Sequence, residues 1–231
     1  MVKSSELYDE HLSQEWIDWV ESLSAEDSRR KEIFPAIQHW LVSAAPSTLV
    51  DIGCGQGACS RLVGANIEYV GVDASNTLIK RANDLYGEAA KRFVSGDVYK
   101  LPLADSSADA VMSVWVWSHL ESLPNATTEM ARILKPGGKF LVINANPDTY
   151  EERKGFYTKY EMKGDVLVGD FDLGEGKVLS NSTLYFHSRD EMTGALESSG
   201  LNIDDTATLG YKETYPQGLY IAISGHKTLK P

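Results

Sequence analysis

The sequence predicts an α/β fold with a doubly wound, mostly parallel seven-stranded sheet whose last strand is antiparallel. Apolar, β-rich runs alternate with helical stretches from residue 48 onward, which is the pattern of a parallel sheet. The first of these runs ends in a glycine-rich turn, and two further β-rich runs close the chain. The 231 residues, 42% of them hydrophobic, are sized for a single domain with a substantial core.

Helices are expected to precede the sheet. Residues 1–45 contain two amphipathic segments, at 14–23 and about 27–43, and Pro46 closes the second. We therefore expect a helical cap over residues 1–45, followed by a ligand-binding core over residues 46–145. The strands of this core are predicted at residues 48–51, 67–73, 92–94, 110–114 and 139–144.

The second half of the chain is predicted in two parts. Pro136-Gly137-Gly138 reads as a turn into the fifth strand, after a helix that contains residues 128–134. Residues 146–187 depart from the alternation, with short β-like runs at 166–171 and 177–186, so we expect an insertion there. Residues 188–231 return to it: a capping box at 188–191 predicts a helix to about residue 199, and a strand pair follows at 201–209 and 218–226.

The composition disfavours several classes of partner. A formal net charge of −11 opposes binding to DNA or RNA, because phosphate contacts need Lys and Arg. Residues 1–10 lack the apolar stretch of a signal peptide, and no apolar run approaches the ~20 residues of a membrane span. We therefore expect a cytoplasmic protein that binds neither nucleic acid nor membrane. Cys54 and Cys59 are expected to be packing residues, so no metal site is predicted.

The glycine-rich turn at residues 53–57 is the most informative feature. Glycines allow positive φ and let a ligand approach the backbone, while a following helix would offer free N–H groups. The turn alone is ambiguous, because it also satisfies the dinucleotide pattern, with Asp73 near the expected distance of ~20 residues. The three glycines of the turn are Gly53, Gly55 and Gly57.

Asp51 separates the two interpretations. A carboxylate at the strand end would repel a pyrophosphate on the turn, whereas it suits a ligand that carries an ammonium and a sulfonium. The run VDIGCGQG at residues 50–57 resembles the first motif of the class I S-adenosylmethionine-dependent methyltransferases, and the resemblance continues to about residue 145. It implies a Rossmann-like fold and S-adenosyl-L-methionine as cofactor, with S-adenosyl-L-homocysteine as product. The resemblance does not extend to residues 146–187, where the departure from the alternation alone leads us to expect an insertion that covers the substrate side.

The resemblance also assigns roles around the cofactor. Asp73 ends the second strand, where it can accept hydrogen bonds from both ribose hydroxyls, since Ser75 is the better helix cap. Asp97 lies in a stretch like the family's G-D-x-x-x-L-P, which implies that it accepts the adenine amine while Val98 N–H reaches a ring nitrogen. The predicted cofactor residues are Asp51, Gly53, Cys54, Gly55, Gly57, Asp73, Ala74, Asp97, Val98 and Ser113.

Residues after the fourth strand are placed beside the methyl group, because open α/β sheets bind ligands beyond the carboxyl ends of their strands. His119 is the candidate general base, and a packing role is the alternative. Trp115 and Trp117 are candidates for an aromatic box around the substrate, with core packing as the alternative. The remaining substrate candidates are Tyr8, which could close over the cofactor, and Tyr157 and Tyr160 in the insertion.

The sequence therefore predicts methyl transfer to an oxygen or nitrogen of a small, aromatic or amine-bearing metabolite. The Asn/Asp-Pro-Pro-aromatic run of exocyclic-amine nucleic-acid methyltransferases does not follow the fourth strand, where Ser113-Val114-Trp115-Val116 stands. A peptide or protein methyltransferase and a non-catalytic S-adenosylmethionine-binding module are the alternatives, and an NAD-dependent oxidoreductase is disfavoured by Asp51. The sequence leaves open the acceptor, the use of a base, the oligomeric state and the pathway.

Overall fold

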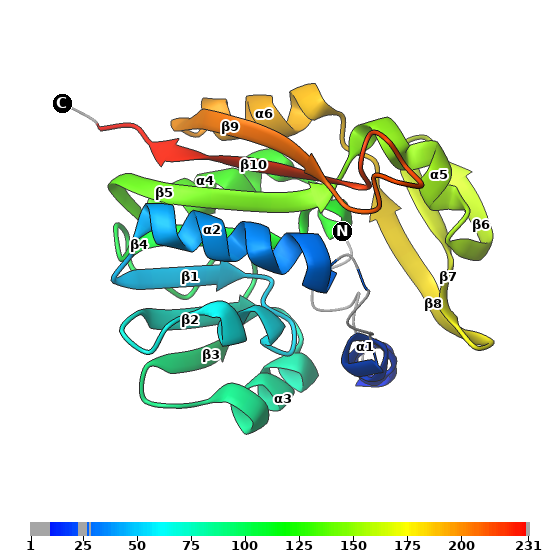
Figure 1. Ribbon diagram of the computed structural model, residues 1–231, viewed down its shortest axis with the longest axis horizontal. Helices are drawn as coiled ribbons and strands as arrows, with labels where there is room; N and C mark the ends of the chain where they lie inside the picture. Colours follow the sequence, from blue (N-terminus) through cyan, green and yellow to red (C-terminus); the bar gives the residue numbers. More distant parts are fainter. Residues whose placement is uncertain (1–9, 23–26, 28, 230–231) are drawn as a thin grey trace.

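A seven-stranded sheet with the order β3-β2-β1-β4-β5-β10-β9 forms the centre of the computed structural model, which describes residues 10–22, 27 and 29–229 (Figure 1). Strands β1 to β5 are parallel, and β10 is antiparallel to both of its neighbours, which confirms the expected fold class. The strands are β1 (Thr48–Ile52), β2 (Glu68–Asp73), β3 (Lys91–Ser95), β4 (Ala108–Val114), β5 (Leu134–Ala145), β9 (Leu201–Leu209) and β10 (Tyr220–Lys227).

Helices cover both faces of this sheet. One hydrophobic core contains side chains of α4 and α6, and the other contains side chains of α2 and α3. Strands β1 and β4 are buried along nearly their whole length, as expected for central parallel strands between two helical layers. The helices are α2 (Phe34–Ala44), α3 (Asn76–Tyr86), α4 (Leu123–Ile133) and α6 (Arg189–Ser198).

The helix caps follow the local sequence. Ser75 accepts a hydrogen bond from Leu78 N at 3.3 Å and begins α3. Ser188 and Glu191 form the expected reciprocal capping box at the start of α6. Before α2, residues Arg29–Ile33 form a short π-helix, so the expected single helix from about residue 27 is interrupted. No helix among the residues described is long and apolar enough to cross a membrane.

The helix expected after the glycine-rich turn does not form. The chain there makes only a 3₁₀ helix, Ala58–Leu62, before Val63 returns to an extended conformation. Residues 53–67 connect the end of β1 at Ile52 to the start of β2 at Glu68, and the helical part of this connection is the 3₁₀ helix alone. The ligand-binding loop is therefore followed by little helical structure, and the expectation of a helix N-terminus at this point was wrong.

The Pro136-Gly137-Gly138 turn lies inside β5 rather than before it. Ala108 pairs with Leu134 and Ala110 pairs with Lys139, so β5 contains a bulge opposite β4. A Cβ atom at Gly138 would lie 3.0 Å from the carbonyl oxygen of Asp109, which explains why glycine occupies this close approach. The strand consequently begins earlier than the sequence predicts.

The predicted insertion contains a second, antiparallel sheet in the order β6-β7-β8. The sequence predicts two of its strands, and β6 was missed because its side chains are mostly exposed and lack an apolar alternation. In Figure 1 this sheet and α1 (Glu10–Ser22) lie beyond the carboxyl ends of β1 and β5. The elements of the insertion are η5 (Pro147–Thr149), α5 (Tyr150–Lys154), β6 (Tyr157–Lys163), β7 (Val166–Gly174) and β8 (Lys177–Tyr185).

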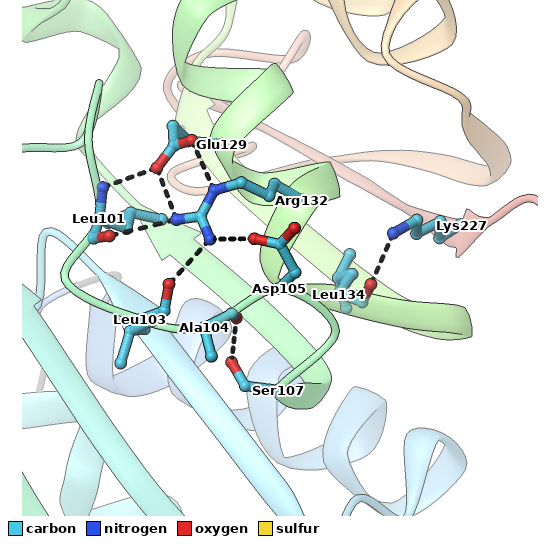
Figure 2. A network of polar contacts seen from close by, with 9 residues as sticks. All are labelled: Leu101, Leu103, Ala104, Asp105, Ser107, Glu129, Arg132, Leu134 and Lys227. Atoms are coloured by element: carbon cyan, nitrogen blue, oxygen red, sulfur yellow. Dashed lines mark hydrogen bonds and ion pairs between the residues drawn. The ribbon is translucent and has the colours of Figure 1, made fainter.

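A polar network fixes the loop between β3 and β4 to α4 (Figure 2). Arg132 donates hydrogen bonds to the carbonyl oxygens of Leu101 and Leu103 at 3.1 and 2.8 Å. It also pairs with Glu129 and Asp105, each at 2.7 Å. Glu129 accepts a further hydrogen bond from Leu101 N at 2.7 Å. The hydrogen bond between the two side chains raises the pKa of Arg132 and lowers the pKa of Glu129, so both stay charged.

Candidate active site

Two adjoining cavities lie at the carboxyl ends of the parallel strands. The first cavity has a volume of about 290 Å³ and lies against the ends of β1 and β2 and the loops after β3 and β4. The second cavity, of about 670 Å³, lies between the ends of β4, β5 and β10 and the insertion. Trp16, Trp115 and His119 line both cavities. The site therefore has two chambers that share one wall.

Asp51 lies at the end of β1 in the first cavity and is 1% exposed. Its Oδ2 atom accepts a hydrogen bond from Tyr69 Oη at 2.7 Å. Burial raises the pKa of Asp51 to about 7, against the opposing effect of the Tyr69 hydrogen bond, and the charge of Asp73 adds to the rise. A cation bound in the cavity would favour the ionised form, so the residue fits the ammonium of the expected cofactor.

Asp73 lies at the end of β2 and lines the same cavity. Its two carboxylate oxygens accept hydrogen bonds from Gly55 N and Ser75 N, each at 2.9 Å. Burial raises the pKa of Asp73, and these hydrogen bonds oppose the rise. Each carboxylate oxygen keeps a further acceptor position, so this arrangement fits a ligand with two neighbouring hydroxyl groups.

The glycine-rich loop presents both backbone and side chain to the first cavity. Gly55 has φ +54, and a Cβ atom there would meet no protein atom within 4 Å. Gln56 is 3% exposed and also lines the cavity, and its Nε2 atom has no hydrogen-bond partner among the described residues. A buried amide without a partner costs free energy, which a bound acceptor group would recover. Sequence reasoning missed Gln56, although its place between two glycines was a signal.

Three of the ten predicted cofactor residues do not line the first cavity. Val98 lines the first cavity, but Asp97 does not. The Oδ1 atom of Asp97 accepts a hydrogen bond from Tyr99 N at 2.9 Å. Gly57 faces the core, where a Cβ atom would lie 2.8 Å from the Phe93 ring. Ser113 is buried inside β4 and lines neither cavity. Of the three acids expected to converge, two line the cavity.

Three of the predicted substrate residues also need correction or lie outside the structure. Trp117 is 2% exposed and packs in the hydrophobic core with Leu120, so it lines neither cavity. Tyr160 is 47% exposed on β6 and lines neither cavity. Tyr8 lies outside the described residues. Tyr157, by contrast, lines the second cavity.

His119 is held at the wall between the cavities by the insertion. Its Nδ1 atom is 3.1 Å from the carbonyl oxygen of Thr183 in β8. A carbonyl oxygen only accepts, so Nδ1 carries the hydrogen and Nε2 carries the lone pair. Burial lowers the pKa of His119, although the hydrogen bond to Thr183 opposes this. The imidazole is therefore neutral near pH 7, in the form that accepts a proton.

Trp115 forms the other part of the shared wall and has an unusual backbone conformation. Its φ is +61, a region that bulky residues rarely adopt. The backbone is held there because Trp115 N donates to Ile143 O at 2.8 Å. Next to it, Val116 packs against the glycine loop, where a Cβ atom at Gly53 would lie 2.1 Å from Val116 Cγ2. The two loops therefore fix each other.

Aromatic side chains from α1 and the insertion close the second cavity. Trp16 and Trp19 pack with ring centroids 5.0 Å apart, and Trp19 meets Phe171 edge-on at 5.7 Å. Both tryptophans line the second cavity. Glu21 of α1 forms a two-oxygen ion pair with Arg81 of α3 at 2.8 and 2.9 Å, which holds the helix over the site.

Comparison with known proteins finds relatives of this chain. Residues 50–142 match the family model described as a methyltransferase domain. The chain is 31% identical over 172 residues to a demethylmenaquinone methyltransferase from Desulfitobacterium hafniense, across 69% of this chain and 68% of that protein. It is 28% identical over 140 residues to a 2-phytyl-1,4-naphtoquinone methyltransferase from Nostoc punctiforme, across 57% of this chain and 61% of that protein.

A solved structure supports the same fold. The S-adenosylmethionine dependent methyltransferase from Mesorhizobium loti superposes with a TM-score of 0.64 at 18% identity, across 87% of this chain and 99% of that chain. The matched family region, residues 50–142, contains the end of β1, all of β2 to β4 and most of β5. It therefore includes Asp51, the glycine loop and Asp73, which line the first cavity.

Proposed function

The chain belongs to the class I S-adenosylmethionine-dependent methyltransferases, and on that premise we propose that it methylates an oxygen or nitrogen of a small, aromatic or amine-bearing metabolite. The enzyme uses S-adenosyl-L-methionine and leaves S-adenosyl-L-homocysteine. The observation that carries the proposal is the wall of Trp16, Trp115 and His119 shared by the two cavities. Because the same three residues line both cavities, the cavities adjoin there, and a cofactor in the first would lie next to an acceptor in the second.

In the first cavity, the chain's own residues would bind and orient the cofactor. The proposed roles are an ion pair from Asp51 to its ammonium, hydrogen bonds from Asp73 to its ribose and an amide hydrogen bond from Gln56 to its carboxylate. We also propose that Val98 packs beside the adenine, because the loop that carries it lines the cavity. When bound, the cofactor supplies a methyl group on a positively charged sulfur.

In the second cavity, the wall residues would position the acceptor and exclude water. Holding an acceptor in line with the methyl group supplies much of the rate enhancement. His119 would accept the acceptor's proton at Nε2, because the Thr183 carbonyl holds the Nδ1 hydrogen. Trp115, fixed in its uncommon conformation, would set the angle at which a flat substrate approaches.

The aromatic walls support the aromatic part of the proposal. Trp16, Trp19, Phe171 and Tyr157 line or adjoin the second cavity, and such rings stack on flat substrates. The names of the two relatives, both methyltransferases that act on quinone-type compounds, also support a small ring-containing acceptor. The proposed partner is therefore a small molecule, with no nucleic acid.

Binding of S-adenosylhomocysteine, followed by product analysis, tests this function. We expect calorimetry to show binding that Asp73→Ala abolishes and that Asp84→Ala, an exposed acid paired with Lys80 on α3, leaves unchanged. Incubation with methyl-labelled cofactor and a metabolite extract should then label a small molecule at oxygen or nitrogen. Labelled protein or peptide would favour a macromolecular substrate, and binding without any labelled product would favour a non-catalytic module.

A further inference from the structure

Arg153 introduces a positive charge into the second cavity. It belongs to α5, at the start of the insertion, and lines the cavity. Nη2 donates a hydrogen bond to the carbonyl oxygen of Leu219, and no other guanidinium nitrogen has a hydrogen-bond partner among the described residues. Nε is buried as well as unpartnered. A buried guanidinium normally uses more of its five N–H donors.

No carboxylate compensates this charge within the part of the chain that the structure describes. Asp27 and Asp172 line the same cavity, but neither forms an ion pair with Arg153. The Asp172 Oδ1 atom is instead bonded to Gly174 N at 2.8 Å. An aromatic ring lies beside the guanidinium, whose carbon is 5.2 Å from the centre of the Tyr220 ring. Burial lowers the pKa of Arg153, although the group remains charged near neutral pH.

A largely enclosed charge without an opposite charge beside it is costly, and a ligand of opposite charge reduces that cost. We propose that Arg153 binds a carboxylate group of the methyl acceptor, so that the substrate is a small acid. This inference rests on the proposed function, because it concerns the acceptor's cavity. A carboxylate carries one negative charge and accepts two parallel N–H bonds from a guanidinium. A phosphate carries more charge than the single arginine neutralises, and Asp172 nearby would repel the excess.

The position of Arg153 also limits where the carboxylate lies. Its guanidinium stacks on Tyr220, and the Tyr220 ring lies 5.5 Å from that of Trp115, in the wall shared with the first cavity. The contacts from Arg153 to Tyr220 and from Tyr220 to Trp115 therefore separate the arginine from the first cavity, where the cofactor's methyl group would lie. A substrate that bridges them has its acceptor atom and its carboxylate at opposite ends of about one aromatic ring. The combination selects an aromatic acid over an amine without an acidic group.

The test compares matched acids and amides on the protein loaded with S-adenosylhomocysteine. The probes are 4-hydroxybenzoate, its neutral analogue 4-hydroxybenzamide, phenyl phosphate and benzylamine. We expect the acid to bind the wild-type complex about tenfold or more tightly than the amide, as a charge-assisted hydrogen bond predicts. We expect Arg153→Met to abolish this preference and Arg153→Lys to keep part of it, while both variants bind S-adenosylhomocysteine within about twofold of wild type.

Arg189→Met is the matched control, because Arg189 pairs with Asp148 on the exposed side of α6 and lines neither cavity. It should keep the full preference for the acid. Equal binding of acid and amide to wild type, tighter binding of benzylamine or phenyl phosphate, or a preference that survives Arg153→Met overturns the inference. So does the absence of acid binding up to about 10 mM, which corresponds to less than about 3 kcal/mol of binding free energy. If the wild-type protein does not bind S-adenosylhomocysteine at all, that result would instead count against the proposed function.

Discussion

Asp51 makes the ligand-free protein less stable as the pH rises, and Asp51→Asn removes that dependence. The pKa of Asp51 is about 7 in the folded protein, against 3.8 for an unperturbed side chain. The folded state therefore holds its proton over a pH range in which the unfolded state has lost it. The stability contributed by this proton is complete below 3.8 and is lost as the pH rises through about 7.

The magnitude follows from the size of the pKa difference. A difference of about three units corresponds to roughly 4 kcal/mol, which is an upper limit for a buried group whose surroundings can relax. Asn keeps an oxygen that can accept the Tyr69 hydrogen bond but cannot ionise. We therefore expect Asp51→Asn to resemble wild type at about pH 4 and to be more stable than wild type, by up to about 4 kcal/mol, at about pH 8.

Chemical denaturation of the ligand-free proteins at both pH values measures this difference. The same carboxylate makes the opposite contribution to ligand binding, because a bound ammonium favours the ionised form. Calorimetry should show that wild type binds S-adenosylhomocysteine more tightly as the pH rises through about 7, whereas Asp51→Asn binds it weakly at every pH. A constant stability difference between the two proteins across the pH range would refute this assignment of the proton to Asp51.

Three further predictions concern other parts of the site. For an acceptor that loses a proton, His119→Gln should lower the rate constant of methyl transfer in a single-turnover assay about 10²- to 10⁴-fold, while the affinity for S-adenosylhomocysteine changes little. An unchanged rate constant would exclude His119 as the base. Gln56→Met should weaken S-adenosylhomocysteine binding about fivefold or more while leaving the ligand-free protein as stable as wild type, because the amide has no partner to lose; calorimetry with unchanged affinity would contradict its role. Arg132→Met should destabilise the fold by about 1–2 kcal/mol in urea denaturation, because it breaks a partly exposed ion pair and the hydrogen bonds to two carbonyl oxygens. A loss below about 0.5 kcal/mol would show that the network contributes little.

The sequence predicted the central sheet well because buried parallel strands have a recognisable local sequence pattern. Each is buried on both faces and therefore appears as a short apolar run between turns. The positions of the two acids were also predictable, since Asp51 and Asp73 lie at the ends of such runs and parallel strands bring their carboxyl ends together. The structure places both acids in the first cavity.

Side-chain positions that depend on the immediate turn were harder to predict. Asp97 follows a strand as Asp73 does, but it does not line the first cavity, and its Oδ1 atom accepts a hydrogen bond from Tyr99 N. Trp115 and Trp117 are two residues apart, and only the first faces the cavity, because a left-handed residue and a short 3₁₀ helix reverse the direction of the chain there. Neither conformation has a recognisable pattern in the sequence.

The sequence by itself determined which segments form the strands of the central sheet, where the glycine loop lies and which carboxylates follow the strand ends, because each of these depends on residues close together in the chain. Only the tertiary structure decided which groups face the acceptor. Thr183 orients His119 from 64 residues away, and Leu219 holds Arg153 from 66 residues away. Contacts between such distant segments depend on how the insertion packs against the sheet, and hydrophobic periodicity carries no information about that packing.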